Sequence, residues 1–425
     1  MERPKILGIS LVFMILFLIV SGAVFRPQQF KEQVTQIIEQ AENYVAGAFF
    51  KESVDDKELV ERYEVLKTSD SSELRRRKRQ GLSTEDIKVL IVPGHDDEHI
   101  GASYKGVREV DLNREVAANL FNFIKDEPGF DVTLASDSRG YHKDLQKYFD
   151  KEGDSILEFR EEYKDEMESL VKRGKVDLVN GVFHNAAPGD MAQKLYGINK
   201  WVNENEFDIV LHIHFNDYAG RKNNQSGKYN GFSIYIPEKQ FSNARASRVF
   251  AEHLEKQLSE FFPVSNNKGE SSGIIEDQEL IAIGAYNTVD AISILVEYGY
   301  IYENQFSDPV LRELMTRELA FQTFQGIKSF FNDEVEETTT LLSEKIINSD
   351  LYEGQKSHPG VLSLQAHLRL SGLYPPEGKS LSECPIAGNF GDCTKDAVKE
   401  FQLKNNIVGS GYVGGITRSK LMEQI

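Results

Sequence analysis

Three polar side chains alternate at the end of one apolar run, "DIVLHIHFND", which extends from Asp208 to Asp217. Successive side chains of a β-strand point to opposite faces, so His212, His214 and Asn216 would share one face of this strand. The residues before them are the aliphatic side chains that a buried strand carries. Two imidazoles and an amide gathered there indicate a site that binds a metal ion or a substrate.

Acids and a histidine follow or interrupt three other runs: His95 after "IVPG", Glu109 in "VREVDLN" and Glu297 in "LVEYGY". A catalytic zinc ion takes three nitrogen or oxygen ligands from the protein and leaves a fourth position for water. A further carboxylate can accept a proton from that water. Glu297 is the most informative of these residues, because an ionised group inside an apolar strand is costly unless it faces a cation or solvent. A buried ion pair is the alternative at Glu297, and an ordinary loop residue or helix-start acid is the alternative at His95 and Glu109.

The surrounding chain alternates strands with helices from Lys88 onward. Runs such as "KVLIVPGH", "FDVTLASD" and "AISILVEYGYI" have the composition of strands, and "NREVAANLFNFIKD" has that of a helix. This alternation predicts an α/β fold with a mostly parallel sheet flanked by helices, and such sheets place their sites at the carboxyl ends of the strands. A highly charged stretch near 141–182 has few apolar faces and is interpreted as an insertion beside the core.

The motifs occur in an order that resembles a known family. "IVPGH", "REVDLN", "DIVLHIHFND" and "ILVEYGYIYEN" are similar to the successive signatures of the zinc-dependent N-acetylmuramoyl-L-alanine amidases called amidase 3, over residues 86–331. Members hydrolyse the amide between the lactyl group of muramic acid and the first L-alanine of the peptidoglycan stem peptide. The resemblance implies that His95, Glu109 and His214 bind Zn²⁺. It also implies that Glu297 is the catalytic glutamate and that Asn216 lies on the substrate side.

The sequence departs from the family pattern at several positions. Asp96 and Asp97 replace a glycine pair, His212 replaces a serine, and Tyr300 replaces a phenylalanine. Because His212 shares a face with His214, spacing alone leaves either as the ligand. We expect His214 to be the ligand and His212 to contact the substrate or the ligands, with a packed core histidine as the alternative. The charged insertion could cover the site as a lid, as an extra helix does in similar amidases, or be an ordinary surface elaboration.

The amino-terminal segment predicts export. Residues 6–25 contain no charged side chain, are long enough to cross a bilayer as a helix, and follow Arg3 and Lys5. We expect a transmembrane anchor, with a cleaved signal peptide ending near Ser21 to Ala23 as the alternative. The remainder would then lie in the cell envelope, on the extracytoplasmic face of the plasma membrane, or be secreted. Residues 26–85 are interpreted as a helical stalk and a basic linker, and the net charge of −18 argues against nucleic acid as a partner.

The carboxyl-terminal region, 358–425, follows a polar linker at 332–357 and predicts three short helices. Cys384 and Cys393 lie close together, and in an oxidising compartment such a pair predicts a local disulfide. The stretches "LQAHLRLSGLY", "GNFGDCTKDAVKEFQ" and "GYVGGITRSKL" resemble the peptidoglycan-binding domain type 1.

Together these features predict a membrane-tethered zinc amidase that binds peptidoglycan through its carboxyl-terminal domain. The alternatives are a catalytically inactive or regulated wall-binding scaffold and a zinc peptidase that cuts within the stem peptide. An activating protein, if the enzyme has one, is not identifiable from the sequence.

Overall fold

The computed structural model describes residues 70–80, 86–179, 187–222, 224–331, 339–344 and 347–423, which all belong to one compact unit. The predicted anchor or signal segment at 6–25 and most of the predicted stalk lie outside these residues. Of the region before the first strand, the structure describes helix α4 (Ser71–Gln80). No helix within the described ranges combines the length and the apolar character that a membrane span requires.

A six-stranded sheet has the order β4-β1-β7-β10-β8-β9. Its strands are β1 (Ile87–Pro93), β4 (Phe130–Leu134), β7 (Ile209–Asn216), β8 (Ser233–Pro237), β9 (Ile274–Asp277) and β10 (Ile292–Tyr300). Strands β4, β1, β7 and β10 are parallel neighbours, whereas β8 pairs antiparallel with β10 and parallel with β9.

The sheet is therefore mostly parallel, as predicted, and it is mixed only because β8 and β9 run opposite to the other four strands. The physical reason is the connection from β7 to β8. No helix separates the two strands in the described residues 217–222 and 224–232, so β8 starts at the edge of the sheet where β7 ended and runs back. A parallel strand would have needed a longer crossover to return to the opposite edge. The sequence pattern showed that 231–236 is a strand but not its direction.

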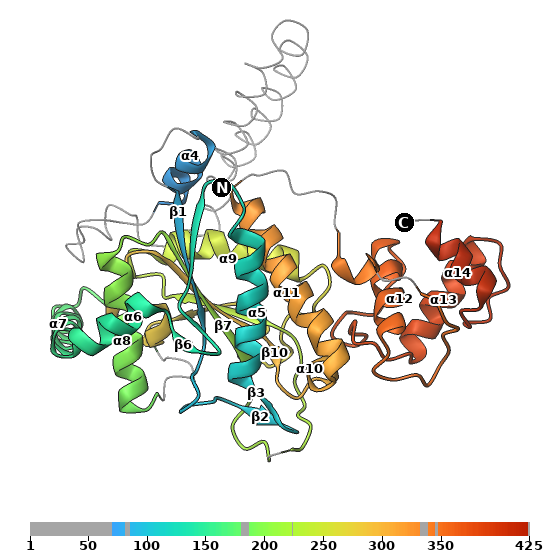
Figure 1. The fold of residues 1–425 in the computed structure, drawn as a ribbon, viewed down its shortest axis with the longest axis horizontal. Helices are drawn as coiled ribbons and strands as arrows, with labels where there is room; N and C mark the ends of the chain where they lie inside the picture. The colour runs from blue at the N-terminus through green and yellow to red at the C-terminus, as the bar shows by residue number, and fades with distance from the viewer. Residues whose placement is uncertain are drawn as a thin grey trace, which may run out of the picture. The chain divides into compact units, whose positions relative to one another are not determined.

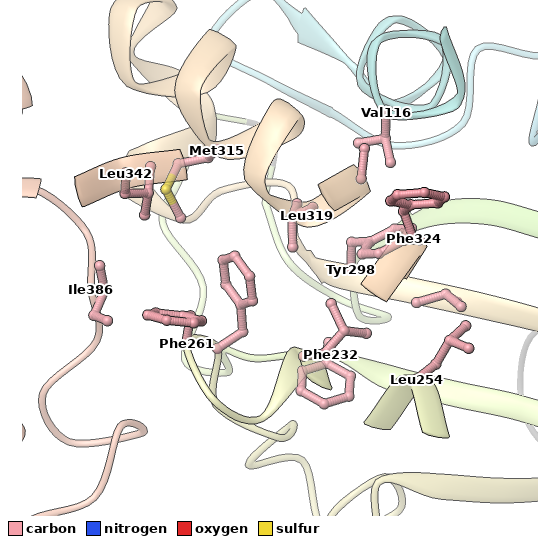
Figure 2. Packing of buried hydrophobic residues seen from close by; sticks show 14 of the residues in the cluster. Val116, Phe232, Leu254, Phe261, Tyr298, Met315, Leu319, Phe324, Leu342 and Ile386 are labelled. Carbon is pink, nitrogen blue, oxygen red and sulfur yellow. The ribbon is translucent and has the colours of Figure 1, made fainter. Parts of the chain in front are cut away.

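Helices cover both faces of the sheet (Figure 1). Val89 and Ile91 of β1 pack in one apolar cluster with α5 (Glu109–Ile124), α9 (Ala244–Leu258) and α11 (Pro309–Phe330). Leu90 and Val92, the alternate residues of the same strand, pack in a second cluster with α8 (Gly189–Glu204). Figure 2 shows part of the first cluster, with Val116, Leu254, Leu319 and Phe324 among the labelled side chains. A strand buried on both faces explains why its sequence is continuously apolar.

The charged stretch predicted near 141–182 forms α6 (Lys143–Lys151) and α7 (Gly153–Lys172), and residues 180–186 are not described. Both helices contact α8. At Gly197 of α8, an added Cβ would lie 2.9 Å from the ring of Phe149 and 3.0 Å from Ile156. The glycine therefore allows α6 and α7 to pack closely onto α8. Two short hairpins precede these helices in the chain. Strand β2 (Ser103–Tyr104) pairs with β3 (Val107–Arg108), and β5 (Ser136–Asp137) pairs with β6 (Gly140–Tyr141).

After β10 the chain forms α10 (Asn304–Ser307) and then α11, and three helices follow in the carboxyl-terminal region. These helices are α12 (Pro359–Leu370), α13 (Asp392–Lys404) and α14 (Gly415–Met422). The predicted three-helix module is confirmed, and so is the disulfide, because Cys384 and Cys393 are bonded with an S–S distance of 2.03 Å.

Two buried glutamines hold the loops of this module, and each side chain is only 1% exposed. The amide nitrogen of Gln365 donates to Thr394 Oγ1 at 2.9 Å, and its oxygen accepts from Gly388 N at 3.0 Å. Gln402 repeats this arrangement with Thr417 Oγ1 at 3.0 Å and Gly411 N at 2.9 Å. We call each set a glutamine lock, since one side chain joins a helix to the loop and to the helix that follows.

Candidate active site

Four predicted site residues meet at one edge of the sheet. His95 follows β1, His214 belongs to β7 and Glu297 to β10, while Glu109 begins α5. Strands β1, β7 and β10 are parallel neighbours, so their carboxyl ends lie side by side, and the register pairs His214 with Glu297. One ligand atom each from His95, Glu109 and His214 lies within 4.8 Å of the others. The structure thus brings these residues together, and their roles remain predictions.

Glycines allow this close approach. A Cβ on Gly94 would lie 2.2 Å from the His214 ring, and a Cβ on Gly101 would lie 2.3 Å from Glu109 Oε2. Gly101 has φ +70°, a conformation that favours glycine. His95 also has a positive φ, 69°, which is uncommon for a residue with a side chain. The backbone is therefore shaped around the two imidazoles.

Glu109 is the centre of this group, and its side chain is 4% exposed. Its Oε1 lies 3.1 Å from His95 Nε2 and 3.1 Å from His214 Nδ1, while Oε2 accepts a hydrogen bond from Ala102 N at 2.8 Å. Burial raises the pKa of Glu109, but the two imidazoles outweigh burial and hold the pKa well below its usual range. Burial likewise lowers the pKa of His95, and the Glu109 charge more than reverses that effect. Two imidazoles and an ionised carboxylate are a ligand set that suits a divalent transition-metal ion.

Glu297 differs from Glu109 although both are buried. Its Oε2 has no hydrogen-bond partner in the part of the chain that the structure describes. Burial raises the pKa of Glu297 well above its usual range, and the charges of Glu109 and Glu270 raise it further. A carboxyl group with a raised pKa beside a ligand group can hold a proton and pass it on.

His212, His214 and Asn216 line one cavity, as the strand alternation predicted. His212 is 1% exposed and is not part of the group that could hold an ion. Burial, and next the neighbouring His214, lower its pKa to about 3, so its imidazole is neutral near pH 7. Neither ring nitrogen of His212 has a partner among the described residues. Asn216 donates from Nδ2 to Glu270 Oε1 at 2.9 Å.

The cavity has a volume of about 950 Å³, and a large part of its wall is apolar. Met191, Leu195 and Ile198 of α8 form one side, opposite the strand ends. No described residue of α6 or α7 lines the cavity, so these helices support α8 from behind. An apolar wall with a few polar groups is typical of a substrate-binding pocket.

The sequence did not indicate two groups that border this site. Glu270 lines the cavity and lies in the loop before β9, where no periodic pattern marked it. Lys194 of α8 pairs with Asp96 at 2.8 Å, and Arg114 pairs with Asp97 at 3.0 Å. The two aspartates that replace a glycine pair are thus engaged with basic side chains.

Comparison with known proteins identifies the class. The model of the N-acetylmuramoyl-L-alanine amidase family (Amidase_3) matches residues 89–329, more than half of the chain, so the chain belongs to that family. It is therefore an enzyme that hydrolyses the amide bond between muramic acid and the peptide of peptidoglycan. A peptidoglycan binding domain model matches residues 357–421, which makes peptidoglycan a partner of the carboxyl-terminal module. Both resemblances found in the sequence are confirmed.

Solved structures of amidases are similar to this chain at low sequence identity. An N-acetylmuramoyl-L-alanine amidase from Clostridium difficile 630 is 15% identical, covers 59% of this chain and 100% of its own, and has a TM-score of 0.37. AmiC2 of Nostoc punctiforme is 14% identical, with coverages of 59% and 99% and a TM-score of 0.37. Ami1 from Mycobacterium smegmatis is 14% identical, with coverages of 58% and 98% and a TM-score of 0.36. A search of curated proteins found no match.

Proposed function

We propose that this amidase is zinc-dependent, with His95, Glu109 and His214 as the ligands and Glu297 as the group that moves the proton. The observation that carries the proposal is the meeting of two imidazoles and a buried carboxylate within 4.8 Å, beside a second carboxyl whose Oε2 has no partner in the described chain.

The residues fit a zinc ion by the chemistry of their donors. Zinc accepts imidazole nitrogen and carboxylate oxygen, and three protein ligands are typical of catalytic sites. The contacts of Glu109 with Ala102 N and with Phe215 N, at 2.8 Å and 3.3 Å, hold the carboxylate in place. When bound, the ion would polarise the substrate carbonyl and lower the pKa of a water molecule. Other divalent ions accept the same donors, so the metal content must be measured.

Glu297 accepts the proton of the attacking water and delivers it to the nitrogen of the departing L-alanine. Its raised pKa favours keeping that proton on the carboxyl group until it is delivered.

We further propose that the enzyme acts on the extracytoplasmic face of the plasma membrane, tethered by residues 6–25, or secreted if that segment is cleaved. The carboxyl-terminal module would raise the local concentration of the active site on the polymer. The net charge of −18 supports a neutral or cationic region of the wall rather than a polyanion as the partner surface.

The test is digestion of purified peptidoglycan by the purified protein, with mass analysis of the products and elemental analysis of the protein. We expect intact stem peptides with new L-alanine amino ends, one zinc ion per chain, and loss of products after chelation and in Glu297→Ala. Glu318→Gln is the matched control, since Glu318 is a buried carboxyl on α11, outside the cavity. Wall binding without cleavage would favour the scaffold, and cuts within the stem would favour the peptidase.

A further inference from the structure

A buried carboxylate lies behind Asn216. Glu270 is 3% exposed, and both of its carboxylate oxygens accept hydrogen bonds. Asn216 Nδ2 at 2.9 Å and the Tyr235 hydroxyl at 3.2 Å donate to Oε1. The hydroxyls of Ser265 at 2.7 Å and Tyr300 at 2.8 Å donate to Oε2. The carboxylate is thus fixed from both sides by groups on β7, β8, β10 and the loop that follows α9.

This arrangement decides which way the amide of Asn216 points. A flipped side chain would bring its oxygen against a carboxylate oxygen of Glu270, and both atoms are acceptors. The nitrogen therefore stays on Glu270, and Oδ1 is the end left for another partner. Asn216 is 2% exposed and lines the cavity, yet its Oδ1 has no hydrogen-bond partner in the described part of the chain.

A buried acceptor without a donor costs about 1–3 kcal/mol, so the bound substrate is expected to supply the donor. Glu109 and Glu297 are the other carboxylates nearby, and when ionised they only accept hydrogen bonds. They therefore cannot supply this donor. The bond that the proposed function cleaves is an amide, and its N–H is a donor close to the reacting carbon.

We propose that Asn216 Oδ1 accepts a hydrogen bond from the N–H of the scissile amide and that Glu270 is the positioning residue that orients Asn216 for it. This inference rests on the proposed function. A trans amide is planar with its N–H and C=O on opposite sides. Holding the N–H at Asn216 therefore turns the carbonyl oxygen away from Asn216.

Tyr300 contributes a donor to Glu270 at a position where this chain departs from the family pattern. It occupies the position where the family pattern carries a phenylalanine, and a phenylalanine could not donate to Glu270. The added hydroxyl shares Oε2 with Ser265 and lies 3.3 Å from the Ser265 oxygen. Removing it in Tyr300→Phe leaves three donors on Glu270, so a partial loss of the orienting effect is expected.

The test compares two soluble substrates, a muramoyl peptide and its ester analogue, in which an oxygen replaces the scissile N–H. Sites that bind an N–H discriminate against analogues that lack it. Asn216→Ala should lower kcat/KM for the amide by about 10- to 100-fold, which corresponds to one hydrogen bond of about 1.4–2.8 kcal/mol. Hydrolysis of the ester should change by less than about threefold, because no hydrogen bond to nitrogen is lost.

Glu270 variants test the positioning role. Glu270→Ala should show the same selective loss on the amide. Glu270→Gln should retain most of the amide preference, because the Ser265 and Tyr300 hydroxyls can rotate to accept from the new amide nitrogen. Asn243→Ala is the matched control: Asn243 is 2% exposed and donates to Ala291 O at 2.8 Å, away from the cavity, so its loss should lower stability and leave the amide-to-ester ratio unchanged.

Each result decides the matter. Equal losses on amide and ester in Asn216→Ala would overturn the inference while leaving the proposed function intact. Loss of bound metal from Asn216→Ala or Glu270→Ala would also overturn it, since the network would then serve the ligands. A wild-type enzyme that leaves the amide intact would instead refute the proposed function, and the inference with it.

Discussion

Three side chains buried in the cavity, His212, Asn216 and Glu297, and two buried in the carboxyl-terminal module, Gln365 and Gln402, are each at most 6% exposed but differ in their partners. Gln365 and Gln402 use both their nitrogen and their oxygen in hydrogen bonds. In the cavity, both nitrogens of His212, one oxygen of Glu297 and the oxygen of Asn216 have none within the described residues. A fully paired buried group stabilises the fold, whereas an unpaired one costs stability and keeps its bonding capacity for a ligand.

The largest expected effect is at Glu297. Glu297→Gln should lower turnover by about 10²–10⁴-fold, because general acid–base catalysis contributes that much. The free energy of unfolding should stay equal or rise, since the change removes an ionisable group whose charged form is costly to bury. Turnover measured with a soluble muramoyl peptide and urea unfolding of the same preparation test both parts. If Glu297→Gln instead lost much of its stability and kept its turnover, Glu297 would have a structural role like that of the paired glutamines.

Gln402 should give the opposite result. Gln402→Leu removes the bonds to Thr417 Oγ1 and Gly411 N and leaves both groups without this partner. We expect the module to lose about 2–4 kcal/mol of unfolding free energy, because each stranded buried group costs about 1–3 kcal/mol. Turnover on a soluble substrate should not change. A Gln402→Leu variant as stable as wild type would contradict the expected difference between the module and the cavity.

The disulfide should have a similar but somewhat smaller effect. Replacing Cys384 and Cys393 together by alanine should cost about 2–3 kcal/mol, because the bond limits the freedom of the unfolded loop. The thermal unfolding of the module, with and without reductant, gives the measurement. Reductant should reproduce the effect in wild type and have no effect on the double variant.

The smallest expected effect is at His253. It tests whether the hydrogen-bond partners of a buried group, rather than its place in the chain, determine its effect on stability and turnover. His253 lies in the catalytic region, and its ring nitrogens contact Ser329 Oγ at 2.8 Å and Arg75 Nη2 at 3.1 Å. Burial, followed by the charges of Arg75 and Lys256, lowers its pKa to about 4. The unfolded chain therefore binds more protons than the folded chain between about pH 6.5 and pH 4, and stability falls as the pH falls through this window.

His253→Asn should remove this part of the pH dependence, about 2 kcal/mol between pH 7 and pH 5. Urea unfolding at the two pH values measures it. Turnover should be unaffected, as for the glutamines. An unchanged pH slope in the variant would show that His253 does not titrate in this way.

Sequence patterns were sufficient to predict the site residues that lie on or next to strands with a periodic apolar pattern. His95, His214 and Glu297 follow or end strands, so their meeting at one edge could be predicted, and Glu109 followed from its motif. Glu270 could not be found in this way, because it lies in a loop and its partners come from four separate segments. The direction of β8 was also hidden, since a strand pattern is the same in either direction. The glutamine locks left a signal that was missed: glutamine, glycine and threonine recur in the same order.

The two glutamine locks differ in the length of chain that they span, and the disulfide lies with the longer one. Gln365 reaches Gly388 across 23 residues, whereas Gln402 reaches Gly411 across only 9. Cys384, which forms the disulfide with Cys393, lies in the longer segment. The shorter segment contains no cysteine. The module thus contains the same hydrogen-bond arrangement twice, once around a short loop and once around a long loop that the disulfide joins to α13. A shorter first loop would leave less chain for the disulfide to restrain, so we expect the cysteines to contribute less to stability in a module trimmed in this way.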